Sequence, residues 1–363
     1  MSNQTNNTTS IKSEKQLSSI GIKVIISIVL SVILLLICMG IGSVSVSLTD
    51  GLTIIYCKLF GKAIPESINP QVVSILWDIR MPRACTAFFA GAALSVSGAV
   101  MQAILQNPLA SSYTMGVSAG ASLGAGFVII HGISSTVLGF FLLPVVGFAA
   151  GLLTVLLVIA FAARLDHNMQ NRTIILFGMI FALFVNAVLT LMSTMASQHM
   201  QRLILWQMGS FSGRRWVHAA ILCGCSIVGT LVLLFFHREL DIMTFGEEQA
   251  MSIGVDTKKT KIWLLILSAF LTGAAVCFSG IIGFIDLAVP HVVRRIFGAK
   301  HRLVLPMSFV LGGAFMALAD MIARSLLSPR EIPVGAVTAL VGAPFFLWVY
   351  FRSPGSKAGE KEA

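Results

Sequence analysis

Residues 84–163 read ACTAFFAGAALSVSGAVMQAILQNPLASSYTMGVSAGASLGAGFVIIHGISSTVLGFFLLPVVGFAAGLLTVLLVIAFAA and contain no Asp, Glu, Lys or Arg. About 20 apolar residues are enough to cross a lipid bilayer as a helix. The block is interrupted at Gln106-Asn107-Pro108 and again at residues 131–135. It therefore predicts three consecutive membrane crossings.

The rest of the chain shares this apolar character. Of its 363 residues 56% are apolar and only 11% are charged, and the mean hydropathy is +0.90. A soluble domain carries about a quarter charged residues because its surface faces water, so most of this surface is expected to face lipid. The net charge of +10 comes from Lys and Arg placed between apolar runs. This pattern is typical of loop flanks rather than of a nucleic-acid-binding surface.

Further charge-free runs predict an all-α membrane protein with many crossings. The runs cover residues 24–47, 173–201, 216–237, 262–285, 303–319 and 332–351, with a weaker candidate at 281–290. Counting the weaker candidate gives ten crossings, and omitting it gives nine.

Orientation is predicted from positive charge, because Lys and Arg accumulate in cytoplasmic loops. With ten crossings and a cytoplasmic N-terminus, 16 of the 25 Lys and Arg residues lie inside and nine lie outside. We therefore predict that both termini are cytoplasmic, with a membrane domain at 23–352 and tails at 1–22 and 353–363. The polar start lacks the pattern of a signal peptide, and residues 1–22 are expected to be disordered.

Motifs for covalent chemistry and nucleotide binding are absent from the sequence. It has no G-x-x-x-x-G-K-[ST], no H-E-x-x-H and no G-x-S-x-G. The seven His residues are dispersed and the six Cys residues are expected to pack in the core, so no metal site is predicted. Asp286 and Asp320 are the only carboxylates expected within the membrane, where an ion-coupled carrier needs such groups. Their scarcity suggests that another polypeptide supplies the energy.

Four motif blocks carry a family resemblance. They are RMPR at 80–83 with GAALSVSG at 91–98, NPLA at 107–110 and GVSAGASLGA at 116–125; FGEEQAMSIGV at 245–255; GFIDLAVPH at 283–291; and AD at 319–320 with EIPVG at 331–335 and GAPFF at 342–346. In this order, over residues 80–351, the chain resembles the FecCD/BtuC-like family. These proteins are the permease subunits of ABC importers for iron-siderophores, haem and cobalamin.

The resemblance implies a type II ABC importer permease of ten transmembrane helices in the bacterial cytoplasmic membrane, with both termini inside. It implies ATP-driven import of an iron chelate, with a siderophore as the first candidate and haem or cobalamin as alternatives. The expected partners are two ATP-binding subunits, an extracytoplasmic substrate-binding protein and a second permease, identical or related. ATP binds the partner subunits, so neither a cofactor nor enzyme activity is expected here. The competing hypothesis is an ion- or proton-coupled carrier that uses Asp286 and Asp320.

The family pattern also implies a docking role for three arginines. Family members carry Arg at the outer ends of two helices, where it docks acidic residues of the binding protein, and the matching positions are Arg80, Arg83 and Arg324. Guanidinium groups suit this role because they bind carboxylates through paired hydrogen bonds and stay charged. The alternative is that Arg80 and Arg83 only anchor a helix end at the lipid headgroups.

The inner loop 240–255 matches the family's coupling helix, which sits in a cleft of the ATPase subunit. The matching residues are Gly246, Glu247, Ala250 and Gly254. Locally they predict a short helix that ends in a turn at Gly254. The alternative is an amphipathic helix that rests on lipid headgroups.

Breaks that contain proline mark candidate moving elements of the gate, at Asn107-Pro108 and at Pro290. Two positions depart from the family pattern. Asp286 stands where Gly is usual, and Ser111-Ser112 follows NPLA, where a Pro is common. A carboxylate within the membrane is costly unless it is paired or hydrated, so Asp286 either pairs with a neighbour or faces the pathway.

Overall fold

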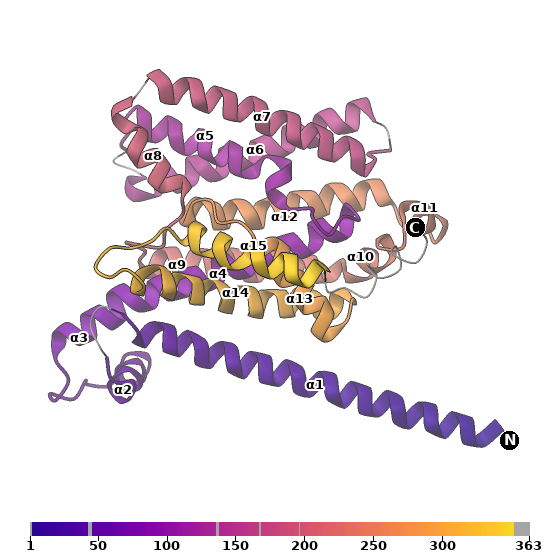
Figure 1. Ribbon diagram of the computed structural model, residues 1–363, viewed down its shortest axis with the longest axis horizontal. Helices are drawn as coiled ribbons and strands as arrows, with labels where there is room; N and C mark the ends of the chain where they lie inside the picture. Colours follow the sequence, from indigo (N-terminus) through magenta and orange to yellow (C-terminus); the bar gives the residue numbers. More distant parts are fainter. Residues whose placement is uncertain (1, 43–45, 136–137, 167, 196, 352–363) are drawn as a thin grey trace.

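A computed structural model describes residues 2–42, 46–135, 138–166, 168–195 and 197–351, and every regular element within these ranges is helical (Figure 1). The predicted tail at 353–363 lies outside the described residues. The α-helices are α1 Ser2–Gly40, α2 Leu48–Leu59, α3 Pro70–Ser74, α4 Met81–Ile104, α5 Val117–Ile130, α6 Leu142–Leu165, α7 Asn171–Met195, α8 Met200–Gln207, α9 Trp216–Phe235, α10 His237–Met243, α11 Glu247–Ser252, α12 Thr257–Ser279, α13 Ile285–Phe297, α14 His301–Ser325 and α15 Val334–Phe351.

The prediction of an all-α, multi-pass membrane protein is confirmed. Within the described residues, seven helical segments are long and apolar enough to cross a membrane. They are Ile20–Gly40, Pro70–Ile104, Gly139–Leu165, Asn171–Met195, Trp216–Phe235, Thr257–Ser279 and His301–Ser325. The other three predicted crossings correspond to α5, α13 and α15, which are 14, 13 and 18 residues long. Both predicted breaks of the charge-free block fall between helices.

The segment that leads into α5 and the start of α13 contact α4 about two-thirds of the way along it, rather than at its end. After α4 the chain turns back, and the Ser112 hydroxyl makes a short hydrogen bond with the hydroxyl of Ser97, about two turns before the end of α4. The Ser97 hydroxyl also lies 2.8 Å from Thr272 Oγ1 of α12. On the other side, a Cβ added at Gly98 would overlap the backbone of Asp286, at the start of α13. α5 and α13 therefore start inside the bundle, which explains why they are short.

α4 forms the centre of the bundle, packed against α14, α12, α9 and α13 (Figure 1). Of its apolar window 83% is buried, against 17% for the window in α1. Glycine permits the closest contacts, because small residues let helix backbones approach in lipid. A Cβ at Gly91 would overlap Gly312 and Met316 of α14, and one at Gly120 would overlap Thr154 of α6.

The ends of the bundle carry different short helices. α2, α3 and α8 lie at the left end in Figure 1, and α10 and α11 lie at the right end, where α1 also begins. At the start of the chain α1 extends back to Ser2, across most of the residues of the predicted tail at 1–22. These residues contain no proline, so the backbone hydrogen bonding of the apolar helix can continue through them.

Candidate functional sites

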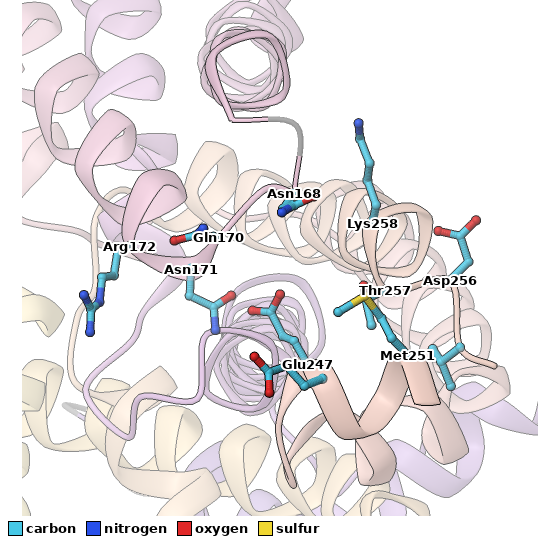
Figure 2. A pocket seen from close by; sticks show the side chains of 11 residues that line it. Asn168, Gln170, Asn171, Arg172, Glu247, Met251, Asp256, Thr257 and Lys258 are labelled. Atoms are coloured by element: carbon cyan, nitrogen blue, oxygen red, sulfur yellow. The ribbon is translucent and has the colours of Figure 1, made fainter. Parts of the chain in front are cut away.

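A cleft of about 800 Å³ opens at the end of the bundle that carries α10 and α11 (Figure 2). Its walls come from the α6–α7 connection, from α11 and from the start of α12. In Figure 2, Arg172 and Lys258 lie toward opposite edges, Glu247 lies between them in this view, and Asn171 lies beside Glu247. The predicted coupling loop therefore forms one wall of a polar cleft.

Two glycines frame α11. Gly246 precedes it with a φ of +124° and Gly254 follows it with a φ of +92°, conformations that residues with a Cβ rarely adopt. The N–H of Val255 closes the turn on the carbonyl of Ala250, at 3.0 Å. The predicted short helix ending at Gly254 is thus present. The Ala250 side chain is fully buried, so its small size serves the packing of α11 on the rest of the chain.

A buried lysine fixes α11 to the bundle. The Lys261 side chain of α12 has no exposed surface, and its Nζ lies 2.5 Å from Glu247 Oε1. The same Nζ donates to the carbonyl of Met169 at 3.0 Å, in the α6–α7 connection. Lys261 therefore joins three segments. Sequence reasoning counted it only as a cytoplasmic charge, although its place at the start of an apolar run was an available signal.

Two further contacts attach the segment before α11. Asp241 Oδ1 of α10 accepts from the backbone N–H of His301 at 2.8 Å and lies 2.7 Å from the ring Nδ1 of the same residue, at the start of α14. Gln106 Nε2, after the end of α4, donates to the carbonyl of Met243 at 2.8 Å. The α10–α11 segment is thus attached to α4, α12 and α14, which are central helices of the bundle.

Asp166 orders the α6–α7 connection on the far side of the cleft. Its Oδ2 accepts from the Thr173 hydroxyl at 2.8 Å and from the N–H of Gln170 at 2.9 Å, and its Oδ1 accepts from the N–H of Asn168 at 3.0 Å. These hydrogen bonds, led by the one from Thr173, lower the pKa of the Asp166 carboxyl, because they stabilise its charged form.

At the opposite end of the bundle the structure brings the three predicted docking arginines together. Arg80, Arg83 and Arg324 line one recess of about 270 Å³, together with Glu331. Arg80 and Arg83 are buried, with 5% and 7% of their surfaces exposed. Arg80 Nη1 donates to the carbonyl of Gly40 at 2.7 Å. The arginines are therefore built into the fold at the edge of a recess, not spread over an open surface.

Carboxylates of the same chain already pair with these arginines. Arg83 donates to Asp320 Oδ1 from Nε at 3.0 Å and from Nη2 at 2.8 Å, and Arg83 Nη1 lies 2.6 Å from Glu331 Oε1. Arg324 Nε lies 3.9 Å from Asp320 Oδ2, and its Nη2 makes a short hydrogen bond to the carbonyl of Cys38. Sequence reasoning treated Asp320 as a possible coupling carboxylate and did not foresee its pairing with Arg83.

The candidate gate residues lie in two places, an exposed turn after α4 and buried positions in α13. Asn107 forms a turn at the end of α4, where its Oδ1 accepts from the N–H of Leu109 at 2.9 Å, and Pro108 is exposed there. Pro290 is buried inside α13. Asp286 is 1% exposed at the start of α13, and its Oδ2 accepts a short hydrogen bond from the Ser111 hydroxyl.

The two departures from the family pattern therefore meet, because Asp286 contacts Ser111. Asp286 Oδ1 has no hydrogen-bond partner among the described residues. Within the same residues, no group of three or more His, Cys, Asp or Glu side chains could hold a metal ion. The Asp286 carboxyl is thus packed between segments at the centre of the bundle.

Comparisons with known proteins agree with this architecture. The model of the FecCD transport family matches residues 29–352. The cobalamin import system permease protein BtuC of Halobacterium salinarum is 38% identical over 298 residues, 82% of this chain and 78% of that protein. The hemin transport system permease protein HmuU of Yersinia pestis is 37% identical over 294 residues, 81% and 88% of the two chains. A solved structure of metal-chelate ABC transporter type, in an inward-facing conformation, gives a TM-score of 0.79 at 29% identity, covering 91% of this chain and 99% of that chain.

Proposed function

Because the chain belongs to the FecCD transport family of ABC-importer permeases, we propose that it forms the membrane path of an ATP-driven importer of an iron chelate. The chain is a multi-pass protein of the bacterial cytoplasmic membrane. A siderophore is the first candidate cargo. Haem and cobalamin are the alternatives, since a cobalamin permease and a hemin permease are 38% and 37% identical to this chain.

The proposed topology has ten crossings with both termini in the cytoplasm. Among the described residues, seven helical segments are long and apolar enough to span a bilayer alone, and α5, α13 and α15 supply the other three. α5 and α13 complete their crossings with the non-helical segments that lead into them from the two ends of the bundle. Non-helical backbone is tolerated at membrane depth where protein surrounds it. The segment before α5 contacts Ser97 of α4 through Ser112, and the start of α13 packs on Gly98 of α4.

The proposed partners inside the cell are two ATP-binding subunits, which supply the ATP site that this sequence lacks. The observation that carries the proposal is the form of the α10–α11 segment, which is attached to central helices on one side and open on the other. Phe245, Met251 and Ile253 are 79%, 55% and 69% exposed around α11. Exposed apolar side chains beside a polar cleft are typical of a protein interface. Gly246, Glu247, Ala250 and Gly254 then position α11 as the coupling helix.

The proposed partner outside is a substrate-binding protein that presents carboxylates to the recess of Arg80, Arg83 and Arg324. A second permease, identical or related, completes the path. α7 and α15 offer apolar surface for it or for lipid, since Leu183 and Leu340 are 71% and 75% exposed.

Transport in this proposal is alternating access. Closure of the ATP-binding subunits moves α11, and the bundle then changes the side on which its path is open. Asn107-Pro108, Asp286 and Pro290 are the proposed moving points, because they lie after the end of α4, at the start of α13 and inside α13. The carrier hypothesis is disfavoured, since Asp320 is paired with Arg83 and Asp286 is covered by Ser111 and its neighbours.

Growth of a strain that lacks this gene tests the cargo. With iron supplied only as one chelate at a time, the deletion is expected to abolish growth on one siderophore class and to spare the others. In a strain that also lacks the gene of the ATP-binding subunit, growth restored by the two proteins together, but not by this chain alone, supports an ABC permease. Unchanged growth on every siderophore, together with a loss of growth when haem is the iron source or when growth depends on added cobalamin, refutes the siderophore assignment.

A further inference from the structure

The two carboxylates that pair with Arg83 differ in how firmly they are held. Asp320 lies on α14, its side chain is 2% exposed, and it accepts from both Nε and Nη2 of Arg83. Glu331 lies in the connection between α14 and α15, its side chain is 40% exposed, and it pairs with Nη1 at 2.6 Å. Asp320 is therefore a fixed partner of the guanidinium. Glu331 can turn into water and recover its hydration, because its side chain is already partly exposed.

The recess beside this pair has an excess of positive charge. The guanidinium groups of Arg80, Arg83 and Arg324 line it together with the Glu331 carboxylate. The buried Asp320 carboxylate is the second negative charge, paired with Arg83 and Arg324. Arg324 Nε has no hydrogen-bond acceptor among the described residues. If Glu331 turns away, the recess loses one of its two negative charges and Arg83 Nη1 loses its acceptor. A carboxylate from another protein then replaces both the lost negative charge and the lost acceptor of Arg83 Nη1, because arginine side chains bind carboxylates through charge-assisted hydrogen bonds.

We propose that Glu331 occupies Arg83 in place of a carboxylate of the substrate-binding protein, which displaces Glu331 when it docks. This inference rests on the docking role proposed above and adds a competitor for it. The pairing keeps a buried guanidinium satisfied while no partner is bound, and an unsatisfied buried charge is costly. It also weakens docking by the free energy needed to displace Glu331 from Arg83. The weaker docking favours release of the binding protein after delivery.

The test measures the affinity of the substrate-binding protein for the full permease with its ATP-binding subunits in lipid nanodiscs. Glu331→Gln keeps the shape of the side chain and removes its charge. The dissociation constant is expected to fall about tenfold, the ratio that one charge-assisted hydrogen bond supplies. The matched control is Glu66→Gln, which removes one charge from an exposed residue between α2 and α3, outside the recess. It is expected to change the affinity less than twofold, as a surface charge does.

Equal effects of the two substitutions would overturn the proposal, because they would reflect net charge alone. Unchanged or weaker binding by the Glu331→Gln permease would overturn it as well, provided that the variant elutes and melts as the wild-type complex does. Glu331→Ala is the second variant and is expected to tighten binding in the same direction. If the wild-type complex shows no binding at all, the docking role itself fails, and this result is distinct from an unaltered affinity in the variant.

Discussion

Replacement of Lys261 by Met tests whether α11 is mechanically joined to the bundle. The substitution keeps a long side chain in a site without exposure, but it removes the 2.5 Å ion pair with Glu247 and the hydrogen bond to Met169. Loss of one partner of a buried pair costs about 3–5 kcal/mol. The Glu247 side chain is 23% exposed and can recover part of its hydration. We therefore expect a cost below this range, of about 2 kcal/mol. This corresponds to roughly a 30-fold rise in the population with α11 detached.

Hydrogen exchange of the peptide that covers α11 measures this population directly. In the Lys261→Met variant the amides of α11 are expected to exchange roughly 30-fold faster, and uptake per ATP hydrolysed is expected to fall. Lys259→Met is the matched control, because Lys259 lies in the same turn of α12 but its side chain is 80% exposed, in an ion pair with Asp256. Such a surface pair contributes at most about 1 kcal/mol. Equal exchange rates in the two variants would refute the reasoning.

Three further predictions follow from the described contacts. Asp286→Asn can keep the hydrogen bond from Ser111 and is expected to retain ATP-driven uptake within a few-fold, whereas a carrier that uses this carboxylate would lose uptake altogether. Gly98→Ala is expected to lower the free energy of unfolding by about 1–3 kcal/mol, because α13 leaves no room for a Cβ at this position. The control is Gly224→Ala, where a Cβ meets open space and the change is expected to be neutral or stabilising. A thermal melt in which Gly224→Ala is the less stable variant would contradict the packing. The lowered pKa of Asp166 means that its contribution to the α6–α7 connection is present at neutral pH and is lost as the pH falls below about 4, through the lowered pKa. The protection factors of the amides in residues 168–173, which are corrected for the intrinsic pH dependence of exchange, should fall in acid for the wild type and not for Asp166→Ala.

Much of the fold could be predicted from charge alone. A membrane span excludes charged side chains over about 20 residues, so the charge-free runs located the helices that cross the bilayer. The helix that begins at Trp216 starts where the charge-free run starts. The sequence did not show that α5 and α13 begin in the middle of the bundle, because that depends on contacts such as Ser97 with Ser112 across a turn.

The sites were less predictable than the helices. Family motifs pointed to the three arginines but not to the partners of Arg83. These partners, Asp320 and Glu331, lie 237 and 248 residues away from Arg83 in the chain, and no spacing rule applies at such separations. The structure also changes the choice of variants. Arg83→Glu would place a third carboxylate beside Asp320 and Glu331, so loss of docking in that variant would not separate recognition from folding.

Lys261 and Ala250 show the same limit on the cytoplasmic side. A lysine near an apolar run is normally a charge that flanks the membrane, and only the fold places its ammonium group against Glu247. Ala250 matched the coupling pattern, but the direction of its side chain could not be known until α11 was placed. The motif therefore located the segment, and packing determined which of its residues face outward.

The energy source is the central claim, and uptake into proteoliposomes tests it most directly. The vesicles would contain the permease with its ATP-binding subunits, the binding protein and the radiolabelled ferric chelate that supports growth. Uptake is expected only when ATP is present on the side of α11, and it should persist when proton and sodium gradients are collapsed. Uptake that follows an ion gradient, proceeds without ATP and continues without the ATP-binding subunits would contradict the account.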